Sequence, residues 1–188
     1  VADKLSTSRK DVCGALENRM ISTLQQLGMA DAKFIVEITK TEEFTPLGTD
    51  SVAYMFTANP TTKPAPVERV ASGGELSRIM LSLKAMLAER KKLPTVIFDE
   101  IDTGVSGRIA DAMGSIISSL SNVMQIIDIT HLPQVASKDG SHFVVYKEDG
   151  RTNIRRLAKS ERVDEIAKML SGSEITEAAR KQAKILLG

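Results

Sequence analysis

The chain has 188 residues and a mass of 20.4 kDa, and its 42% apolar and 26% charged residues are typical of a globular protein with a sizeable core. Its 25 basic and 24 acidic side chains leave a net charge of +1, so no overall basic charge points to nucleic acid. No apolar run approaches the ~20 residues that span a bilayer, and the single cysteine, Cys13, cannot form a disulfide within the chain. We therefore expect no membrane partner and a reducing, cytoplasmic location.

The first segment, residues 2–28, has the period of an amphipathic helix. Its apolar residues recur at steps of three or four residues or their multiples, at Leu5, Val12, Leu16, Met20, Leu24 and Leu27. The apolar stripe is narrow, so the pattern fits either a helix packed on a domain or the end of a coiled-coil arm that enters a head. We therefore divide the chain into residues 1–28 and a second part, residues 29–188.

Two alternating segments, residues 33–40 and 51–57, predict an antiparallel pair of strands. A proline-rich connector follows, which cannot join a central strand. It leads into a helix predicted from Gly74 to about Arg90, with one apolar face.

The second half of the chain predicts a strand, a helix and a second strand at residues 95–98, 106–120 and 123–129. Both strands are nearly continuous apolar runs, which favours a buried, parallel pair joined by a right-handed crossover. A hairpin at 142–147 and 151–157 and two helices at 160–170 and 174–187 complete the expected elements. The predicted fold class is α/β, with parallel core strands, antiparallel hairpins and flanking helices.

Two short motifs contain residues suited to binding a phosphate and to its hydrolysis. Ser72, Gly73 and Gly74 open a helix, where free backbone N–H groups and the helix dipole favour an anion. Asp99 and Glu100 follow an apolar strand, so their carboxylates are expected at its exposed end. One carboxylate can hold Mg²⁺ through a water while the other orients a water for attack on a γ-phosphate.

A histidine and a further acid are expected near the same strand ends. His131 ends the second apolar strand, and neighbouring parallel strands end at one edge of a sheet. Asp102 lies in the loop just beyond the carboxylate pair. A Ser-His-Asp hydrolase fits poorly, because no Gly-x-Ser-x-Gly motif accompanies them. No Gly-x-x-x-x-Gly-Lys-[Ser/Thr] loop occurs either, so one copy of this chain is expected to bind nucleotide poorly.

These motifs, in this order, resemble the signature and Walker B motifs of ABC-type ATPase heads, and in particular the C-terminal lobe of the head of SMC-like proteins. Residues 70–81, 98–107 and 130–136 carry the likeness, which is greatest to the RecN branch of that family. The most discriminating part is the Thr-His-Leu-Pro-Gln-Val run that contains His131. In this family the Walker A lobe comes first and a long coiled coil separates it from the second lobe.

The resemblance implies an ATPase that acts in DNA double-strand-break repair and recombination, with ATP and Mg²⁺ held between two heads. Ser72 and Gly74 would contact the γ-phosphate of the ATP on the opposite head. The resemblance also assigns Gly73, Glu75 and Asp102 to nucleotide binding, with Asp102 at the interface between heads. Asp99 would bind Mg²⁺, and Glu100 and His131 would be catalytic. Expected partners are the chain's own N-terminal Walker A lobe, a second head in a homodimer, and DNA at the nucleoid.

Two other functions remain open from the sequence. The missing Walker A motif also fits a non-catalytic module that keeps the fold and serves dimerisation or DNA docking. A third hypothesis is the head of another SMC-like branch. In every case this chain alone is expected to be inactive as an ATPase.

Overall fold

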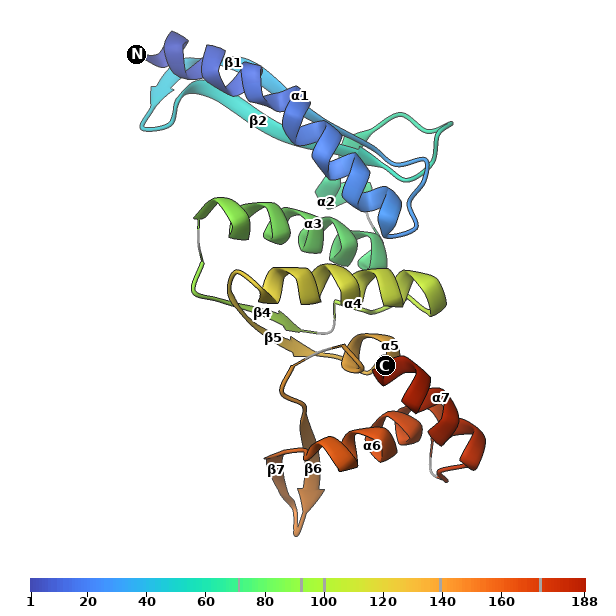
Figure 1. The fold of residues 1–188 in the computed structure, drawn as a ribbon. Coiled ribbons are helices and arrows are strands. Elements are labelled where there is room, and N and C mark those ends of the chain that lie inside the picture. The colour runs from blue at the N-terminus through green and yellow to red at the C-terminus, as the bar shows by residue number, and fades with distance from the viewer. Residues whose placement is uncertain (71, 92, 100, 139, 173) are drawn as a thin grey trace. The chain divides into compact units, whose positions relative to one another are not determined.

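In the computed structural model, all residues are described except 71, 92, 100, 139 and 173, and of residues 70, 89 and 91 only the backbone is described. The chain forms two compact units, Val1–Arg90 and Lys91–Gly188. Figure 1 shows the order of the helices and strands along the chain.

The first unit is built on a long helix and a two-stranded hairpin. Helix α1 (Ala2–Gln26) lies along the antiparallel strands β1 (Lys33–Thr45) and β2 (Gly48–Thr57) (Figure 1). The predicted helix and antiparallel pairing are confirmed, but both strands continue further toward the turn than expected. A shift in register between Lys40 and Thr45 absorbs the irregular sequence there.

The core of this unit lies where the last turns of α1 meet the hairpin. Met20 and Leu24 of α1 are fully buried and pack with Phe34 of β1 and Phe56 of β2, each 1% exposed. The first half of α1 buries only Ser6. Contact with the hairpin thus places residues 1–28 in the same unit as residues 29–90, and their assignment to the end of a coiled-coil arm stays a prediction.

A polar contact fixes the far end of the hairpin to α1. The Arg9 guanidinium donates to Asp50 Oδ2 at 2.8 Å and to the carbonyl of Leu47 at 2.8 Å. The Asp50 side chain is only 1% exposed, and its hydrogen bond to Arg9 lowers the pKa of that carboxyl. Because the ionised carboxylate is the form that pairs, this contact contributes stability above the ordinary aspartate pKa and loses it in acid.

Short elements join the hairpin to the next helix. β3 (Ala65–Pro66) pairs with the edge of β2, and α2 (Val67–Val70) follows it. Pro66 is thus accommodated at an edge, consistent with the expectation that it cannot join a central strand. α3 (Gly73–Lys91) begins directly after Ser72, and Ile79 joins the core cluster of Met20, Leu24 and Phe34.

The second unit opens with the predicted strand–helix–strand crossover. β4 (Thr95–Asp99) and β5 (Gln125–Ile129) pair in parallel, with Asp99 opposite Ile129, and α4 (Gly107–Ser121) connects them. α4 has a fully apolar buried face that includes Met113 and Ile117. The short helix α5 (Pro133–Ala136) follows β5 after three residues.

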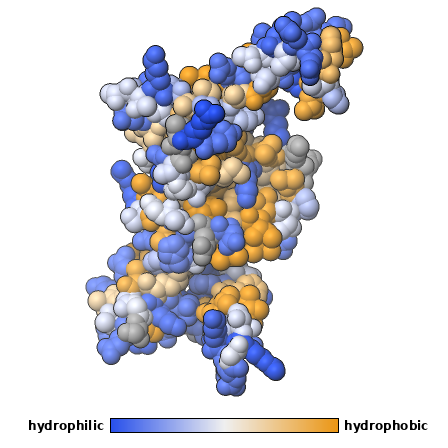
Figure 2. Space-filling model, turned by 180° about the vertical axis from the view of Figure 1, so that it is seen from behind, coloured by the Kyte–Doolittle hydropathy of each residue, from blue (hydrophilic) through white to orange (hydrophobic). Residues whose placement is uncertain are grey.

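One face of the β4–β5 pair is exposed, which differs from the prediction of strands buried on both faces. Val96 and Phe98 are buried, whereas Ile97, Ile127 and Ile129 are 55%, 45% and 50% exposed. Figure 2 shows that exposed apolar surface is visible on this side of the molecule, including a large area near the middle of the view. Apolar residues therefore occupy a sheet face that this chain leaves in contact with water.

The unit ends with the hairpin β6 (Phe143–Glu148) and β7 (Arg151–Arg156), then α6 (Lys159–Ser171) and α7 (Glu177–Leu187). Both helices were predicted, and they pack on each other through Ile166, Ala167, Ala179 and Ala183. Among the helices that the structure describes, none combines the length and apolar character needed to cross a bilayer.

Candidate functional site

The Ser-Gly-Gly motif forms the N-terminus of α3, as predicted. Ser72 precedes the helix, and its hydroxyl accepts the backbone N–H of Glu75 at 3.4 Å. The Glu75 carboxylate in turn accepts the backbone N–H of Ser72 at 2.8 Å. This reciprocal arrangement is a capping box, in which two backbone donors at the helix start are satisfied by side chains.

The two glycines leave the remaining donors accessible. Gly73 and Gly74 are the first residues of α3, so their N–H groups have no carbonyl one turn earlier within the helix. A Cβ added to Gly73 would meet no atom within 4 Å, so the backbone is open on that side. A phosphate can therefore approach Gly73, although the Glu75 carboxylate lies close by and carries the same sign of charge.

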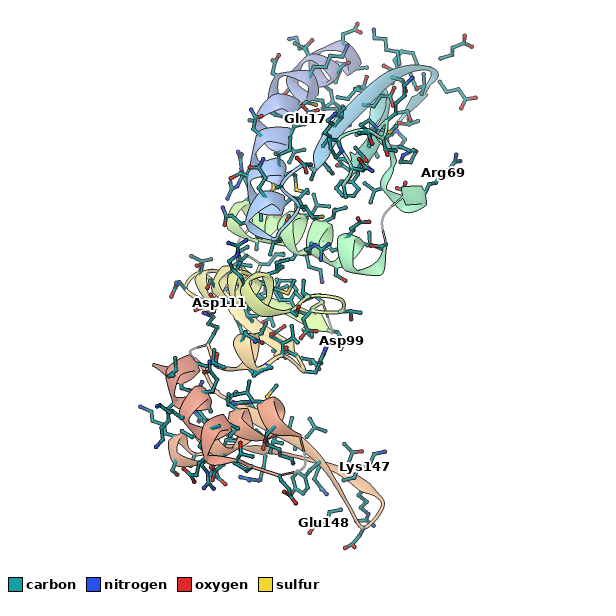
Figure 3. All side chains as sticks on the ribbon, turned by 90° about the vertical axis from the view of Figure 1, so that its right-hand side faces the viewer. Glu17, Arg69, Asp99, Asp111, Lys147 and Glu148 are labelled. Atoms are coloured by element: carbon teal, nitrogen blue, oxygen red, sulfur yellow. The ribbon has the colours of Figure 1, made fainter. Side chains whose placement is uncertain are left out.

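The acidic pair lies at the end of β4. Asp99 is the last residue of that strand and its side chain is exposed (Figure 3), as the prediction of a strand-end carboxylate required. Glu100, the predicted catalytic carboxylate, lies outside the described residues. Its role rests on the sequence alone.

Asp102 is buried, and it links the loop after β4 to the loop after β5. Its Oδ2 atom accepts the hydroxyl of Thr130 and the backbone N–H of His131, the latter at 3.3 Å. Its Oδ1 atom lies 3.4 Å from Nδ1 of His131. The Asp102 side chain is 2% exposed and that of His131 is 65% exposed, so the imidazole faces solvent while the carboxylate lies behind it.

The parallel pairing of β4 and β5 explains why these residues meet. Asp99 is opposite Ile129, so the loops that begin at residues 100 and 130 leave the same edge of the sheet. The carbonyl of Asp102 accepts the N–H of Val105 at 3.2 Å, and Gly104 has a positive φ of 76°, which closes a tight turn around Asp102. The predicted proximity of the β4 end and His131 is thus observed for Asp102.

The sequence assigned no role in this cluster to two of its residues. Thr130 donates to Asp102 and accepts the N–H of Leu132 at 3.0 Å, which holds the turn that presents His131. Asp128, two residues before Thr130, is a half-buried acid: burial, and then the charge of Asp102, raise its pKa to about 6. The signal for Thr130 was its position directly after an apolar strand, next to the histidine.

The raised pKa of Asp128 predicts a specific dependence of stability on pH. The carboxyl of the unfolded chain ionises near its ordinary pKa of 3.8, whereas the folded protein holds the proton to about pH 6. Stability is therefore lost as the pH rises through this window. We expect Asp128→Asn to be more stable than the parent at pH 7 by about 1–2 kcal/mol, because the group is partly solvated, and to lose this advantage at pH 4.

Urea denaturation of parent and variant at pH 4, 5.5 and 7 would measure the difference. Asp149→Asn is the matched control, because Asp149 is exposed at the β6–β7 turn and asparagine tolerates its positive φ. A difference in unfolding free energy that stays constant across the pH range would contradict the assignment.

The predicted site residues are thus grouped in two places. Ser72, Gly73 and Glu75 lie in the first unit, and Asp99, Asp102 and His131 in the second. Within the described residues, no group of three or more His, Cys, Asp or Glu side chains could hold a metal unaided. Asp99 fits Mg²⁺ all the same, because this ion commonly takes one or two carboxylates and completes its shell with waters and phosphates.

Comparison with curated proteins shows strong similarity along the whole chain. It is 43% identical over 191 residues to the DNA repair protein RecN of Rickettsia conorii, a match that covers 100% of this chain and 35% of that protein. For RecN of Haemophilus influenzae the identity is 37%, covering 99% of this chain and 34% of that protein. The resemblance to RecN predicted from the motifs is confirmed, and the chain spans about a third of these relatives. No protein-family model matches the chain.

Solved structures confirm the fold class. The Smc head domain with a coiled coil and joint from Pyrococcus yayanosii matches with a TM-score of 0.67 and 16% identity, over 84% of this chain and 29% of that chain. A chain from a study of ATP-driven dimerization and DNA-stimulated activation of SMC ATPases matches with a TM-score of 0.58 and 16% identity, over 86% of this chain and 94% of that one. The chain therefore has the fold of a lobe of an SMC-type head.

Proposed function

We propose that this RecN-like chain supplies the signature and Walker B lobe of an ATP-hydrolysing SMC-type head that acts in DNA repair. The observation that carries the proposal is the pair of strand ends at β4 and β5. Asp99 is exposed at the end of β4, opposite Ile129, and His131, two residues after Ile129, is exposed to solvent. Full-length similarity to proteins named DNA repair protein RecN supports the assignment to repair.

In this proposal each residue has a separate task. The backbone N–H groups of Gly73 and Gly74 bind the γ-phosphate of ATP held by a second head. Asp99 holds Mg²⁺ through a water, and the ion neutralises phosphate charge. Glu100 orients the attacking water, and His131 contacts the γ-phosphate as a hydrogen-bond donor.

The first partner is a Walker A lobe, which binds the nucleotide. Because the chain spans only about a third of its curated relatives, the remainder of such a protein offers the residues for that lobe. The exposed isoleucines of β4 and β5 support its docking there, since an apolar sheet face is stabilised by burial. A second copy of the head, and DNA, complete the proposed assembly.

A non-catalytic docking module is the second candidate. It is favoured by the capping box, in which the Glu75 carboxylate accepts the Ser72 N–H that a phosphate would otherwise bind. In that case the head fold would serve pairing and DNA binding without turnover.

ATP hydrolysis by this chain, reassembled with a RecN-type Walker A lobe, separates the two candidates. We expect no turnover by either part alone and turnover of at least ~1 per minute by the mixture, which is modest for an enzyme. Sedimentation first establishes that the two parts associate. Association without any hydrolysis would favour the docking module.

A further inference from the structure

We propose that Asp102 is a positioning residue for His131: its buried carboxylate fixes the imidazole with Nδ1 protonated and directed inward, so that Nε2 faces solvent. This inference rests on the proposed function for its role in catalysis, but the geometry it asserts is independent of turnover. It assigns Asp102 to the support of this lobe's own histidine, in place of the predicted contact with nucleotide at an interface between heads.

The hydrogen bonds around Asp102 argue for this role. Oδ2 is already used twice, by the Thr130 hydroxyl and by the His131 backbone N–H. Oδ1 is buried and accepts no hydrogen bond from the residues that the structure describes. Nδ1 of His131 lies 3.4 Å from Oδ1 and can donate to it when it carries a proton.

An unsatisfied buried carboxylate oxygen is costly, since it has lost its water without gaining a donor. Protonation of Nδ1 removes this cost, because Nδ1–H can donate to Oδ1 after a small rotation of the ring. The neutral imidazole then carries its lone pair on Nε2. Once a proton reaches Nε2, that nitrogen becomes a donor toward solvent, where the proposed γ-phosphate would lie.

The Asp102 carboxylate is held in place by its surroundings, whereas the His131 ring is exposed to solvent. Asp102 is 1% exposed and lies in the tight turn closed by Val105. Thr130 ties it to the loop after β5 and also receives the N–H of Leu132. A carboxylate buried to this degree is poorly placed to reach a ligand in solvent, but well placed to orient a neighbour that does.

Nitrogen-15 NMR on the intact chain tests the geometry directly. The chain has two histidines, His131 and His142. The imidazole signals that disappear in His131→Gln therefore belong to His131, and those that remain belong to His142. At pH 8 a free imidazole is neutral, and we expect His131 to be mainly the Nδ1–H tautomer in the parent. In Asp102→Asn the ratio of Nδ1–H to Nε2–H should fall about tenfold, as expected for loss of a charge-assisted hydrogen bond.

Thr130→Ser is the matched control, because it keeps the hydroxyl that bonds to Asp102 and should leave the tautomer ratio unchanged. A parent protein in which His131 is mainly Nε2–H would overturn the inference, and this outcome needs no variant to fold. So would an Asp102→Asn protein that folds and keeps the parent ratio.

Kinetics in the full-length protein link the geometry to catalysis. If Asp102 acts through His131, Asp102→Asn lowers kcat about tenfold or more alone, but causes no further loss on a His131→Gln background. Additive losses would overturn the positioning role. Absence of ATPase activity in the parent would count against the proposed function, whereas the tautomer measurement would still decide the geometry.

Discussion

A Gly73→Asp variant should fold as well as the parent and lose ATP hydrolysis by at least ~100-fold. A Cβ at Gly73 meets no atom within 4 Å, and the residue does not need a positive φ, so an aspartate fits the backbone. An acid in the first turn of α3 also suits the helix dipole, by about 0.3–1 kcal/mol, offset in part by its repulsion from Glu75. The substitution is therefore compatible with the fold.

The same negative charge would oppose the γ-phosphate. Two like charges about 4 Å apart repel by roughly 4 kcal/mol at an effective dielectric constant of about 20, which corresponds to almost three orders of magnitude in rate. Because the motif is proposed to act on ATP held by the opposite head, we expect ATP binding to survive while ATP-dependent pairing of heads is lost. Filter binding, sedimentation with ATP and a turnover assay on the full-length protein measure the three steps.

Gly14→Asp provides the matched control. Gly14 also has open space around its Cα, but it lies within α1, away from the motif. It should leave turnover within about twofold of the parent, as surface substitutions away from special features commonly do. If Gly73→Asp hydrolyses ATP at the parent rate, the N-terminus of α3 is not the phosphate site.

The regular elements could be predicted because their apolar periods reflect burial. α1 was expected at residues 2–28 and spans Ala2–Gln26, and the parallel pairing of β4 and β5 followed from two apolar runs around one helix. The short elements β3, α2 and α5 have two to four residues each, too few to show a period.

The exposed face of β4 and β5 was not predicted by the local sequence pattern. The apolar pattern predicted that Ile97, Ile127 and Ile129 would be buried, yet all three are exposed. An apolar residue can be buried by a partner chain as well as by its own chain, and the pattern does not distinguish the two. The sequence could not show what the chain itself would leave uncovered. In the proposed function, the partner lobe would cover these exposed isoleucines.

The sequence predicted that the loops after β4 and β5 meet, but not the hydrogen bonds between them. Strand-end reasoning brought Asp102 and His131 to one edge, because that depends only on the parallel order of β4 and β5. Which polar atoms then pair depends on loop conformation, as in the contact of Thr130 with Asp102, 28 residues apart. Glu75 illustrates the same limit: the motif pointed to phosphate, and the structure uses its carboxylate to cap Ser72.

A Glu100→Gln variant of the full-length protein should bind ATP and pair its heads, but hydrolyse ATP at least ~100-fold more slowly. Glutamine preserves size and hydrogen bonding while it removes the charge that would orient and polarise the attacking water. Asp99 remains to hold Mg²⁺, so nucleotide affinity should change little. Glu148→Gln, the same substitution at the exposed β6–β7 turn (Figure 3), should leave turnover at the parent rate.

The two variants together identify which step each motif serves. Gly73→Asp should arrest the cycle before pairing, whereas Glu100→Gln should arrest it after pairing, so that paired heads accumulate in ATP. Sedimentation at saturating ATP distinguishes these states without reference to turnover. Near-normal hydrolysis by Glu100→Gln would exclude this carboxylate from the chemical step. Failure of Glu100→Gln to pair would instead place it in nucleotide binding, since loss of a water-orienting group alone leaves the ATP-bound state intact.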